Sequence, residues 1–344
     1  MNAIEKMLSY AKKNNCSDVH LTTNSAPMLR INGDMQIINS APILSDKQII
    51  DMLHSIMTEE QKKIFAEKWD IDFSVQIGDS LRFRVNGFRT IYGSAAVFRE
   101  IPTEIKSLDS LHAPEIIREL AHAKKGLILV VGPTGSGKST TLAGLIDYIN
   151  ANFSHHIITI EDPVEFVHKP KKSLINQREV GASTKTFASA LKGALREDPD
   201  VILVGEMRDI ETIHMALTAA ETGHLVLGTL HTSSAAQTIN RIIDVFPAAD
   251  KPVVRTMLSS SIKAVISQRL VKKEGGGRCA AYEIMIANPS IRNLIREDKI
   301  AQINSIIELN RKSGMCLMKN YLEDLFNKGL ISKEIYEESV HGNE

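Results

Sequence analysis

A glycine-rich stretch at residues 127–140 constrains the fold of this chain more than any other part of the sequence. An apolar run, 127–131, ends at a glycine, and Lys138 and Ser139 follow with the spacing G-x-x-x-x-G-K-S. This order predicts a buried strand, a tight loop whose backbone N–H groups cradle phosphate oxygens, and a helix whose positive end lies beneath them. The stretch therefore predicts a site for a nucleoside triphosphate.

The loop and the first turn of the expected helix supply the predicted nucleotide-binding residues. They are Gly132, Pro133, Thr134, Gly135, Ser136, Gly137, Lys138, Ser139 and Thr140. We expect Lys138 to reach the β- and γ-phosphates and the Ser139 hydroxyl to hold Mg²⁺. A glycine-rich structural turn is the alternative, but the strand pattern before the loop and the helix pattern after it both match the motif.

Composition argues against several other classes of protein. Lys plus Arg and Asp plus Glu both total 41, so the chain has no overall basic field that would favour nucleic acid or anionic lipid. Three scattered cysteines without C-x-x-C pairing argue against a zinc ribbon or a disulfide framework. No signal-peptide pattern opens the sequence, and no apolar run approaches the ~18 residues that span a bilayer. We expect a cytoplasmic protein that meets membranes only through partners.

The first hundred residues predict a small domain with both helices and strands. Apolar residues at helical spacing predict a helix at the start of the chain. Short apolar pieces between turn formers predict two or three strands over 17–38. Two capping boxes predict a pair of helices over 46–68.

A β-hairpin is expected at the end of this domain. Apolar and polar residues alternate over 71–85 about a turn at 78–80. The period of two places Arg82 and Arg84 together on the face opposite the apolar one. A proline, charges and turn formers then predict a linker over 101–114.

The rest of the chain first alternates strands with helices and then becomes wholly helical. Strands that are apolar on both faces, each followed by polar residues, are expected at 127–131, 157–160, 201–204 and 225–230. Helices are expected at about 187–195 and 209–221. The sequence therefore predicts an α/β chain with a domain at 1–100, the linker, a nucleotide-binding core at 115–287 and a helical region at 288–344.

Acidic residues follow two of the core strands. Hydrolysis of a γ-phosphate needs a carboxylate that orients the attacking oxygen, together with a metal ion and positive charge. Glu206 is the expected metal-site acid, acting through water, and Glu161 and Glu165 are alternative catalytic bases. A solvated loop carboxylate is the simpler alternative for each of them.

Two histidines flank the strand 225–230. His231 follows its carboxyl end, where a side chain can contact the γ-phosphate and report its loss, and His224 precedes it. We predict a catalytic role for both. A histidine satisfied in the core or at the surface is the alternative.

Four stretches together resemble the secretion ATPases of type II secretion and type IV pili, most specifically the pilus-retraction subgroup. Residues 158–166, Ile-Thr-Ile-Glu-Asp-Pro-Val-Glu-Phe, resemble the Asp box of that family. Residues 204–209, Val-Gly-Glu-Met-Arg-Asp, resemble its Walker B element, and 222–232 its His box. Residues 290–297, Ser-Ile-Arg-Asn-Leu-Ile-Arg-Glu, are similar to the AIRNLIRE element of the retraction subgroup.

The resemblance covers nearly the whole chain and implies a PAS-like N-terminal domain, a RecA-like ATPase domain and a ring-shaped homohexamer. It also implies ATP and Mg²⁺ as cofactors, and an inner-membrane platform protein and the pilus machinery as partners. Glu165 becomes the expected catalytic carboxylate and Glu206 the Mg²⁺-site acid. Three arginines become candidates to complete the active site of a neighbouring subunit: Arg82, Arg84 and Arg99.

The same resemblance implies that the helix near residue 290 couples the motor to its partner. The residues expected to take part are Ile291, Arg292, Asn293, Leu294, Ile295 and Arg296. Its apolar face should pack on the ATPase domain. Its basic face, formed by Arg292, Arg296 and Lys299, has no obvious internal partner in the sequence. A solvated charged face is the alternative.

The expected function is a hexameric ATPase motor that powers pilus retraction and twitching motility. A pilus-assembly or type II secretion ATPase is the nearest alternative, but those proteins usually carry a four-cysteine zinc insert that three scattered cysteines cannot form. A nucleotide-regulated switch is the alternative from another class. The guanine-specifying pattern Asn-Lys-x-Asp is absent from the sequence.

Overall fold

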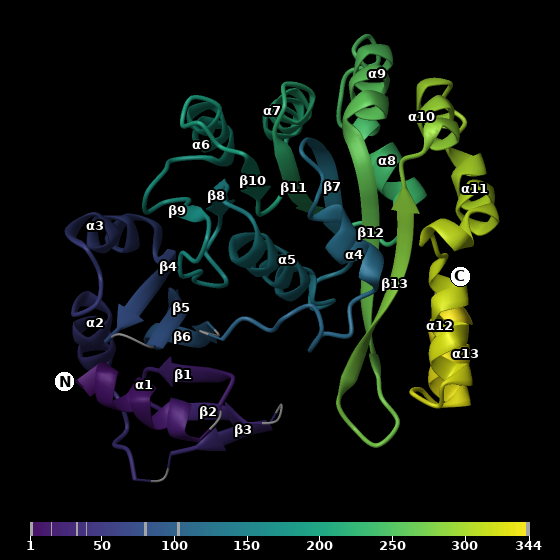
Figure 1. Ribbon diagram of the computed structural model, residues 1–344. Helices are drawn as coiled ribbons and strands as arrows, with labels where there is room; N and C mark the ends of the chain where they lie inside the picture. Colours follow the sequence, from purple (N-terminus) through teal and green to yellow (C-terminus); the bar gives the residue numbers. More distant parts are fainter. Residues whose placement is uncertain are drawn as a thin grey trace. The chain divides into compact units, whose positions relative to one another are not determined.

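The computed structural model describes residues 3–14, 16–31, 34–38, 40–78, 81–101 and 104–341. These form two compact units (Figure 1). The first unit comprises Met1–Glu104 and Pro163–Val167, and the second comprises Ile105–Asp162 and His168–Glu344. The boundary near residue 104 falls within the predicted linker 101–114, of which residues 102 and 103 lie outside the described part.

The first unit is built on an antiparallel six-stranded sheet with the strand order β3-β2-β1-β6-β5-β4. Helices α1, α2 and α3 bury their apolar sides in its core, which includes Ile4, Leu53 and Phe65. The elements are α1 (Ala3–Lys13), β1 (Asp18–Thr22), β2 (Met28–Ile31), β3 (Asp34–Ile37), α2 (Asp46–His54), α3 (Glu59–Lys68), β4 (Asp70–Ile77), β5 (Leu81–Thr90) and β6 (Gly93–Ile101).

Local sequence signals predicted much of this unit correctly. Both capping boxes are present, with Ser45 and Thr58 capping α2 and α3. The expected hairpin is β4 paired with β5, although the turn residues 79 and 80 lie outside the described part. Arg82 and Arg84 are half-buried and alternate with buried apolar residues, as the period of two predicts.

The second unit contains a seven-stranded sheet with the strand order β13-β12-β7-β11-β10-β8-β9. Every pair is parallel except the antiparallel pair of β12 with β13. Its strands and their connecting helices are α4 (Glu115–Leu120), β7 (Gly126–Val131), α5 (Lys138–Asn152), β8 (His156–Glu161), β9 (Leu174–Glu179), α6 (Phe187–Ala194), β10 (Val201–Val204), α7 (Ile210–Glu221), β11 (Leu225–Leu230), α8 (Ala235–Asp244), α9 (Lys251–Ser261), β12 (Ile262–Lys272) and β13 (Arg278–Ile286).

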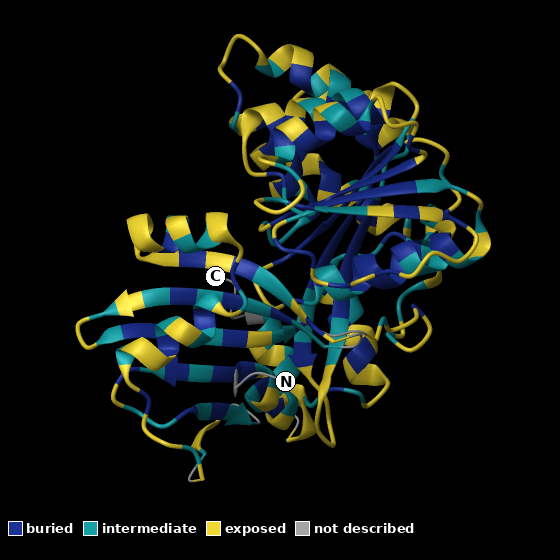
Figure 2. Cartoon of the chain, turned by 90° about the vertical axis from the view of Figure 1, so that its left-hand side faces the viewer, coloured by how far each residue is buried: buried dark blue, intermediate teal, exposed yellow. Residues whose placement is uncertain are grey.

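Helices cover both faces of this sheet, which explains why its central strands are apolar throughout. Alternate residues of β7 enter two different cores. Leu127 and Leu129 pack in the core shared with α6 to α11, whereas Ile128 and Val130 pack in the core shared with α4 and α5. The strands appear as continuous buried ribbons in Figure 2. The α/β class predicted from the sequence is confirmed.

The strands β9, β12 and β13 were not predicted. The β12–β13 hairpin interrupts its apolar residues with polar ones, so it lacks the continuous apolar run of the central strands. The helical prediction for the last part of the chain is confirmed, apart from 3₁₀ turns and one isolated bridge at Cys316. Its helices are α10 (Pro289–Arg296), α11 (Ile303–Leu309), α12 (Met318–Asn327) and α13 (Lys333–His341).

Candidate nucleotide site

The phosphate-binding loop runs from the carboxyl end of β7 to the start of α5. Three of its residues, Gly132, Gly135 and Gly137, have positive φ angles of 150°, 78° and 88°. A Cβ atom on Gly132 would lie 2.3 Å from the Gln268 carbonyl oxygen and 2.6 Å from the Ser136 hydroxyl oxygen. Glycine is therefore required here both by the backbone conformation and by the lack of space.

Lys138 keeps a positive charge at this loop. Its ammonium group donates hydrogen bonds to the carbonyl oxygens of Gly132, at 2.7 Å, and Pro133, at 3.0 Å, and its side chain is buried. Ser139 and Thr140 are half-buried in the first turn of α5, where free backbone N–H groups and the helix dipole favour an anion. The predicted loop residues therefore form a cationic, donor-rich strand-to-helix turn.

The structure brings Glu206 and His231 together beside this loop. The strand order β7-β11-β10 places the end of β11, which carries His231, between the ends that carry the loop and Glu206. The Glu206 Oε1 atom lies 3.1 Å from the His231 Nε2 atom and also pairs with Arg208. The hydrogen bond to Glu206 raises the pKa of Arg208. Arg208 had no predicted role, although it lies within 204–209, the stretch that resembles a Walker B element.

Close packing of the strand ends holds the Glu206 turn in place. The Gly205 amide donates to the Ile160 carbonyl oxygen at 2.7 Å, and the Met207 amide donates to the Thr229 carbonyl oxygen at 3.0 Å. A Cβ atom on Gly205 would lie 3.1 Å from the Ile160 carbonyl oxygen. This close approach explains why a glycine, rather than an acid, directly follows the strand.

The two alternative catalytic bases belong to different units. Glu161 ends β8 and accepts hydrogen bonds from Thr159, at 2.7 Å, and Gln177, at 3.3 Å. Glu165 is exposed and lies in Pro163–Val167, which belongs to the first unit. Their assignment as catalytic bases stays a prediction.

The prediction for His224 is not supported by the geometry of the second unit. His224 lies at the amino end of β11, where its carbonyl accepts a hydrogen bond from the Gly126 amide at the start of β7. A six-residue strand separates it from His231, about 20 Å at the usual rise per residue. Its ring Nδ1 lies 3.0 Å from the Ala219 carbonyl oxygen at the end of α7. Because they flank one strand, the two histidines lie at opposite ends of β11.

The candidate trans-acting arginines each have a partner within the first unit. Arg82 donates to the Ser74 hydroxyl at 2.8 Å, and Arg84 lies 3.4 Å from the Asp72 carboxylate. Arg99 donates to the buried carboxylate of Asp18 at 2.7 Å. Burial raises the pKa of Asp18, but hydrogen bonds from Ser17 and Arg99 outweigh it and leave the pKa lowered. A role in a neighbouring subunit stays a prediction.

Helix α10 corrects one expectation. Its apolar residues Ile291, Leu294 and Ile295 are buried in the core, as expected. Arg292, however, is not without an internal partner. Its guanidinium donates to three carbonyl oxygens at the end of α9, those of Ser259 (2.6 Å), Ser260 (2.8 Å) and Ile262 (2.8 Å).

This arrangement gives Arg292 a structural function, because it satisfies the carbonyl groups that a helix end leaves open and complements the helix dipole there. Burial lowers the pKa of Arg292, and nearby Arg296 adds to the effect. Of the predicted coupling residues, only Asn293 and Arg296 are exposed.

Oxygen ligands suit a Mg²⁺ ion, which proteins commonly hold through one or two side chains together with nucleotide phosphates and water. The Ser139 hydroxyl and the Glu206 carboxylate fit this donor set. Within the described residues, no group of three or more His, Cys, Asp or Glu side chains is arranged to hold a metal. No helix in the described part is long and apolar enough to cross a membrane.

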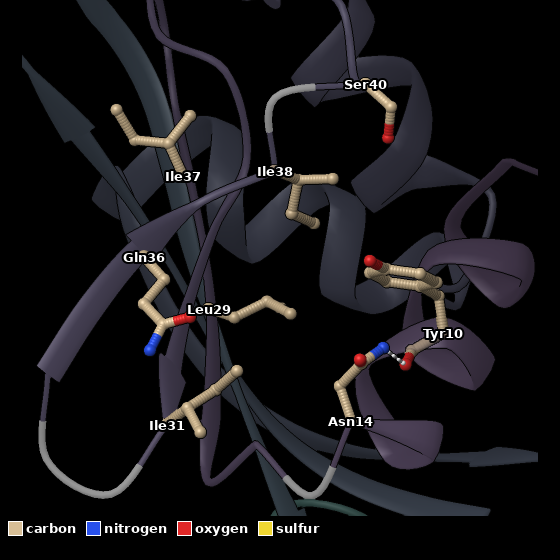
Figure 3. A pocket seen from close by; sticks show the side chains of 8 residues that line it. All are labelled: Tyr10, Asn14, Leu29, Ile31, Gln36, Ile37, Ile38 and Ser40. Carbon is tan, nitrogen blue, oxygen red and sulfur yellow. Dashed lines mark hydrogen bonds between the residues drawn. The ribbon is translucent and has the colours of Figure 1, made fainter.

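A separate pocket of about 340 Å³ lies in the first unit, between α1 and the β2–β3 hairpin (Figure 3). Both apolar and polar side chains line it. The residues that line it are Tyr10, Asn14, Leu29, Ile31, Gln36, Ile37, Ile38 and Ser40. None of them is a predicted site residue.

The chain is similar to characterised proteins over nearly its whole length. A family model described as type II/IV secretion system protein matches residues 1–336. The type IV pilus retraction ATPase PilT of Pseudomonas aeruginosa is 54% identical over 331 residues, which cover 96% of each chain. A twitching motility protein of Neisseria gonorrhoeae is 57% identical over 309 residues, which cover 90% of this chain and 82% of the relative.

A solved structure supports the same similarity. The crystal structure of the pilus retraction motor PilT with bound ADP matches this chain with a TM-score of 0.92 and 48% sequence identity. The match covers 98% of this chain and 97% of the other.

Proposed function

Because the chain belongs to the type II/IV secretion system protein family, we propose that it is an ATPase motor that powers retraction of a type IV pilus. The observation that carries the proposal is a group of residues at the carboxyl ends of the parallel strands in the second sheet, which we call its carboxyl edge. There the Lys138 loop and the Glu206–His231 pair end three adjacent strands, β7, β10 and β11. The sequence identity to pilus retraction ATPases supports pilus retraction as the process that ATP hydrolysis drives.

In the proposed mechanism, the loop amides and Lys138 bind the β- and γ-phosphates of ATP. Ser139 and Glu206 would hold a Mg²⁺ ion, which would supply positive charge against the phosphate oxygens. Glu165 orients a water molecule and accepts its proton as the water oxygen attacks the γ-phosphorus. The bond to the oxygen bridging the β- and γ-phosphates then breaks. His231, in contact with Glu206, is placed to respond when the γ-phosphate leaves.

We assign the first unit to a PAS-like domain and the second to a RecA-like domain, with 288–344 as a helical region. Six copies form a cytoplasmic ring, recruited to the inner-membrane base of the pilus machine. Arg82, Arg84 and Arg99 then complete the active site of a neighbouring subunit. An arginine supplied by a neighbour raises the rate by about 10³–10⁵-fold.

Complementation between inactive chains tests the shared active site. Arg82→Ala/Arg84→Ala chains mixed with Lys138→Ala chains should regain part of the ATPase activity, because some interfaces then combine an intact loop with intact arginines. Sequential affinity purification through two different tags, followed by size-exclusion chromatography, establishes that the rings are mixed. Mixed rings without any activity would contradict the assignment of these arginines.

Cells that lack the chain test the proposed process. They should keep surface pili but lose twitching, and the wild-type gene should restore movement while the Lys138→Ala gene should not. Loss of surface pili would instead identify an assembly or secretion ATPase. A purified wild-type chain that binds ATP without turning it over would favour the nucleotide-regulated switch.

The exposed side of α10, with Asn293 and Arg296, is the proposed contact to the pilus machinery. Arg296→Glu should leave ATP turnover near normal and stop twitching. Lys319→Glu, which reverses an exposed charge on α12, is the matched control and should leave both ATP turnover and twitching near normal. Normal twitching of the Arg296 variant, or parallel loss of its ATPase activity, would remove this contact from the proposal.

A further inference from the structure

Gln268 is a buried polar residue that adjoins the phosphate-binding loop from a neighbouring strand. Its side chain lies in β12 and is only 2% exposed. The parallel register pairs Ser267 with Val131, the last residue of β7, so Gln268 comes alongside Gly132. The loop thus begins directly beside this glutamine.

Both ends of the Gln268 amide group are hydrogen-bonded to the loop or to its helix. The Nε2 atom donates to the Ser136 carbonyl oxygen at 2.9 Å, and the Oε1 atom accepts from the Thr141 hydroxyl at 2.8 Å. A carbonyl oxygen can only accept, so the NH₂ group must face Ser136, and this settles which way the amide points. A side chain with both a donor and an acceptor is needed to make the two contacts.

The bond to Ser136 determines the direction of the next backbone N–H group. A trans peptide unit is planar, with its C=O and N–H groups pointing in opposite directions. Since the Ser136 carbonyl points at Gln268, the Gly137 N–H points away from Gln268. Glycine suits residue 137, because its φ angle is 88° and a Cβ there would lie 2.8 Å from the Gln268 Nε2 atom, which would have to move. Gln268 and Gly137 therefore fit one another.

We propose that Gln268 is a positioning residue that orients the Ser136–Gly137 peptide so that its N–H group binds a nucleotide phosphate. The proposal rests on the ATPase function proposed above. Gln268 acts through the loop backbone and does not itself touch the reacting atoms. The alternative is a glutamine that only stabilises the fold, and that alternative predicts no specific effect on nucleotide affinity.

Gln268→Met tests this proposal. Methionine is unbranched and similar in length to glutamine, so the shape changes little, but it can make neither hydrogen bond. The expected result is about a tenfold weaker Kd for ADP and a similarly raised KM for ATP, with a smaller change in kcat. Isothermal titration calorimetry gives the Kd, and a phosphate-release assay gives the kinetic constants.

The matched control is Asn150→Leu, which removes two buried hydrogen bonds from the other end of α5, those to Lys169 and Lys171. It should lower the melting temperature while leaving Kd and KM unchanged. Equal nucleotide affinities for Gln268→Met and the wild type would overturn the proposal. Parallel losses of affinity in both variants would overturn it too.

Gln268→Glu adds a pH readout that a purely structural role would not produce. An ionised carboxylate repels the Ser136 carbonyl, whereas a protonated one donates to it as the amide does. Burial favours the neutral form, so the pKa of the introduced group should lie above its usual range. We therefore compare the ADP affinity of Gln268→Glu with that of Gln268→Met at each pH. The ratio of the two affinities should rise at least threefold as the pH falls from 8 to 6. A threefold gain is about half of the expected tenfold loss on a logarithmic scale.

A ratio that stays flat between pH 8 and pH 6 would overturn the proposal. The cross-strand neighbour Tyr282 does not confuse the result, because burial raises its pKa and keeps it neutral over this range. A wild-type chain that binds ADP but does not hydrolyse ATP would reject the proposed function, and the ADP titrations would still decide the role of Gln268. A wild-type chain that binds no ADP would overturn both.

Discussion

In the second unit, the carboxyl ends of the parallel strands form one edge of the sheet and their amino ends form the other. The two edges differ in the groups that could bind a nucleotide. The carboxyl edge collects the phosphate-binding loop, Glu206 and His231 from three adjacent strands. The amino edge carries His224, whose ring lies near a helix carbonyl. The two histidines flank the same strand, so the difference lies in the edge and not in the residue type.

Strand direction explains this difference. In a parallel sheet the helices that follow the strands begin at the carboxyl edge and end at the amino edge. Helix α5 therefore presents its free N–H groups and positive dipole end at Lys138, and its carbonyl end near Asn150. An anion is stabilised at the first edge and not at the second.

The largest expected effect compares two lysines, one after the loop that follows β7 and one directly before β7. Lys138→Ala should lower ATP turnover by about 10³-fold or more, because the charge held at the loop is removed. Lys125→Ala, an exposed residue at the amino edge, is the matched control and should keep the wild-type rate. Steady-state phosphate release measures both. Similar losses in the two variants would contradict the contrast between the edges.

Glu206→Gln is the next test and keeps the size of the side chain. Turnover should fall on the order of 10²-fold, since the support for the metal ion is weakened, while nucleotide still binds. Glu221→Gln, at the end of α7, changes a carboxylate on the amino side and should change turnover less than about twofold. The assigned role of Glu206 is wrong if its variant hydrolyses ATP at the parent rate.

The two histidines give the sharpest form of the comparison. His231→Gln should slow turnover by about tenfold, through loss of its contact with Glu206. His224→Gln should leave the ATPase rate of the purified protein almost unchanged, because its side chain lies at the opposite edge. A slower His224 variant would mean that the amino edge contributes to catalysis, for example in a neighbouring subunit.

A buried histidine outside the nucleotide site should affect stability and not chemistry. His168 precedes β9, and burial lowers its pKa from 6.5 to about 4. The unfolded chain therefore binds this proton first, and stability that is fully present above pH 6.5 is lost as the pH falls towards 4. The loss should reach about 3 kcal/mol at pH 4.

Urea unfolding of the wild type and of His168→Gln across pH 4–7 measures this contribution. The variant should show a flatter dependence on pH, with turnover at pH 7 close to that of the wild type. Equal slopes for the two proteins would show that His168 does not titrate in the predicted way.

Local patterns predicted the elements that depend only on neighbouring residues. The strand, loop and helix around residues 126–152 follow from apolar runs, glycines and the Lys138–Ser139 pair. In the first unit, the two capping boxes predicted helices α2 and α3, and the alternation of apolar and polar residues predicted the β4–β5 hairpin. The grouping of Glu206 with His231 was also expected, because both follow strands of the same parallel sheet.

Contacts between residues far apart in the sequence were decided by the tertiary structure. Arg292 was expected to be exposed, yet it caps α9 more than thirty residues earlier in the chain. Gln268 lies in a strand that was not predicted, and no local signal marks it, because it stands between the polar residues Ser267 and Arg269. No spacing rule links it to Ser136, because the register between β12 and β7 is set by the packing of whole strands.

The sequence by itself thus determined which residues can carry phosphate chemistry in this chain, since the backbone conformation of a glycine loop and the end of a strand are local properties. Tertiary structure decided which of them meet. It brought His231 to Glu206 through the pairing of β10 with β11, and it placed Gln268 beside the loop by strand register. Both depend on how the sheet is assembled, because a side chain's partner across a sheet is chosen by the burial of two whole strands.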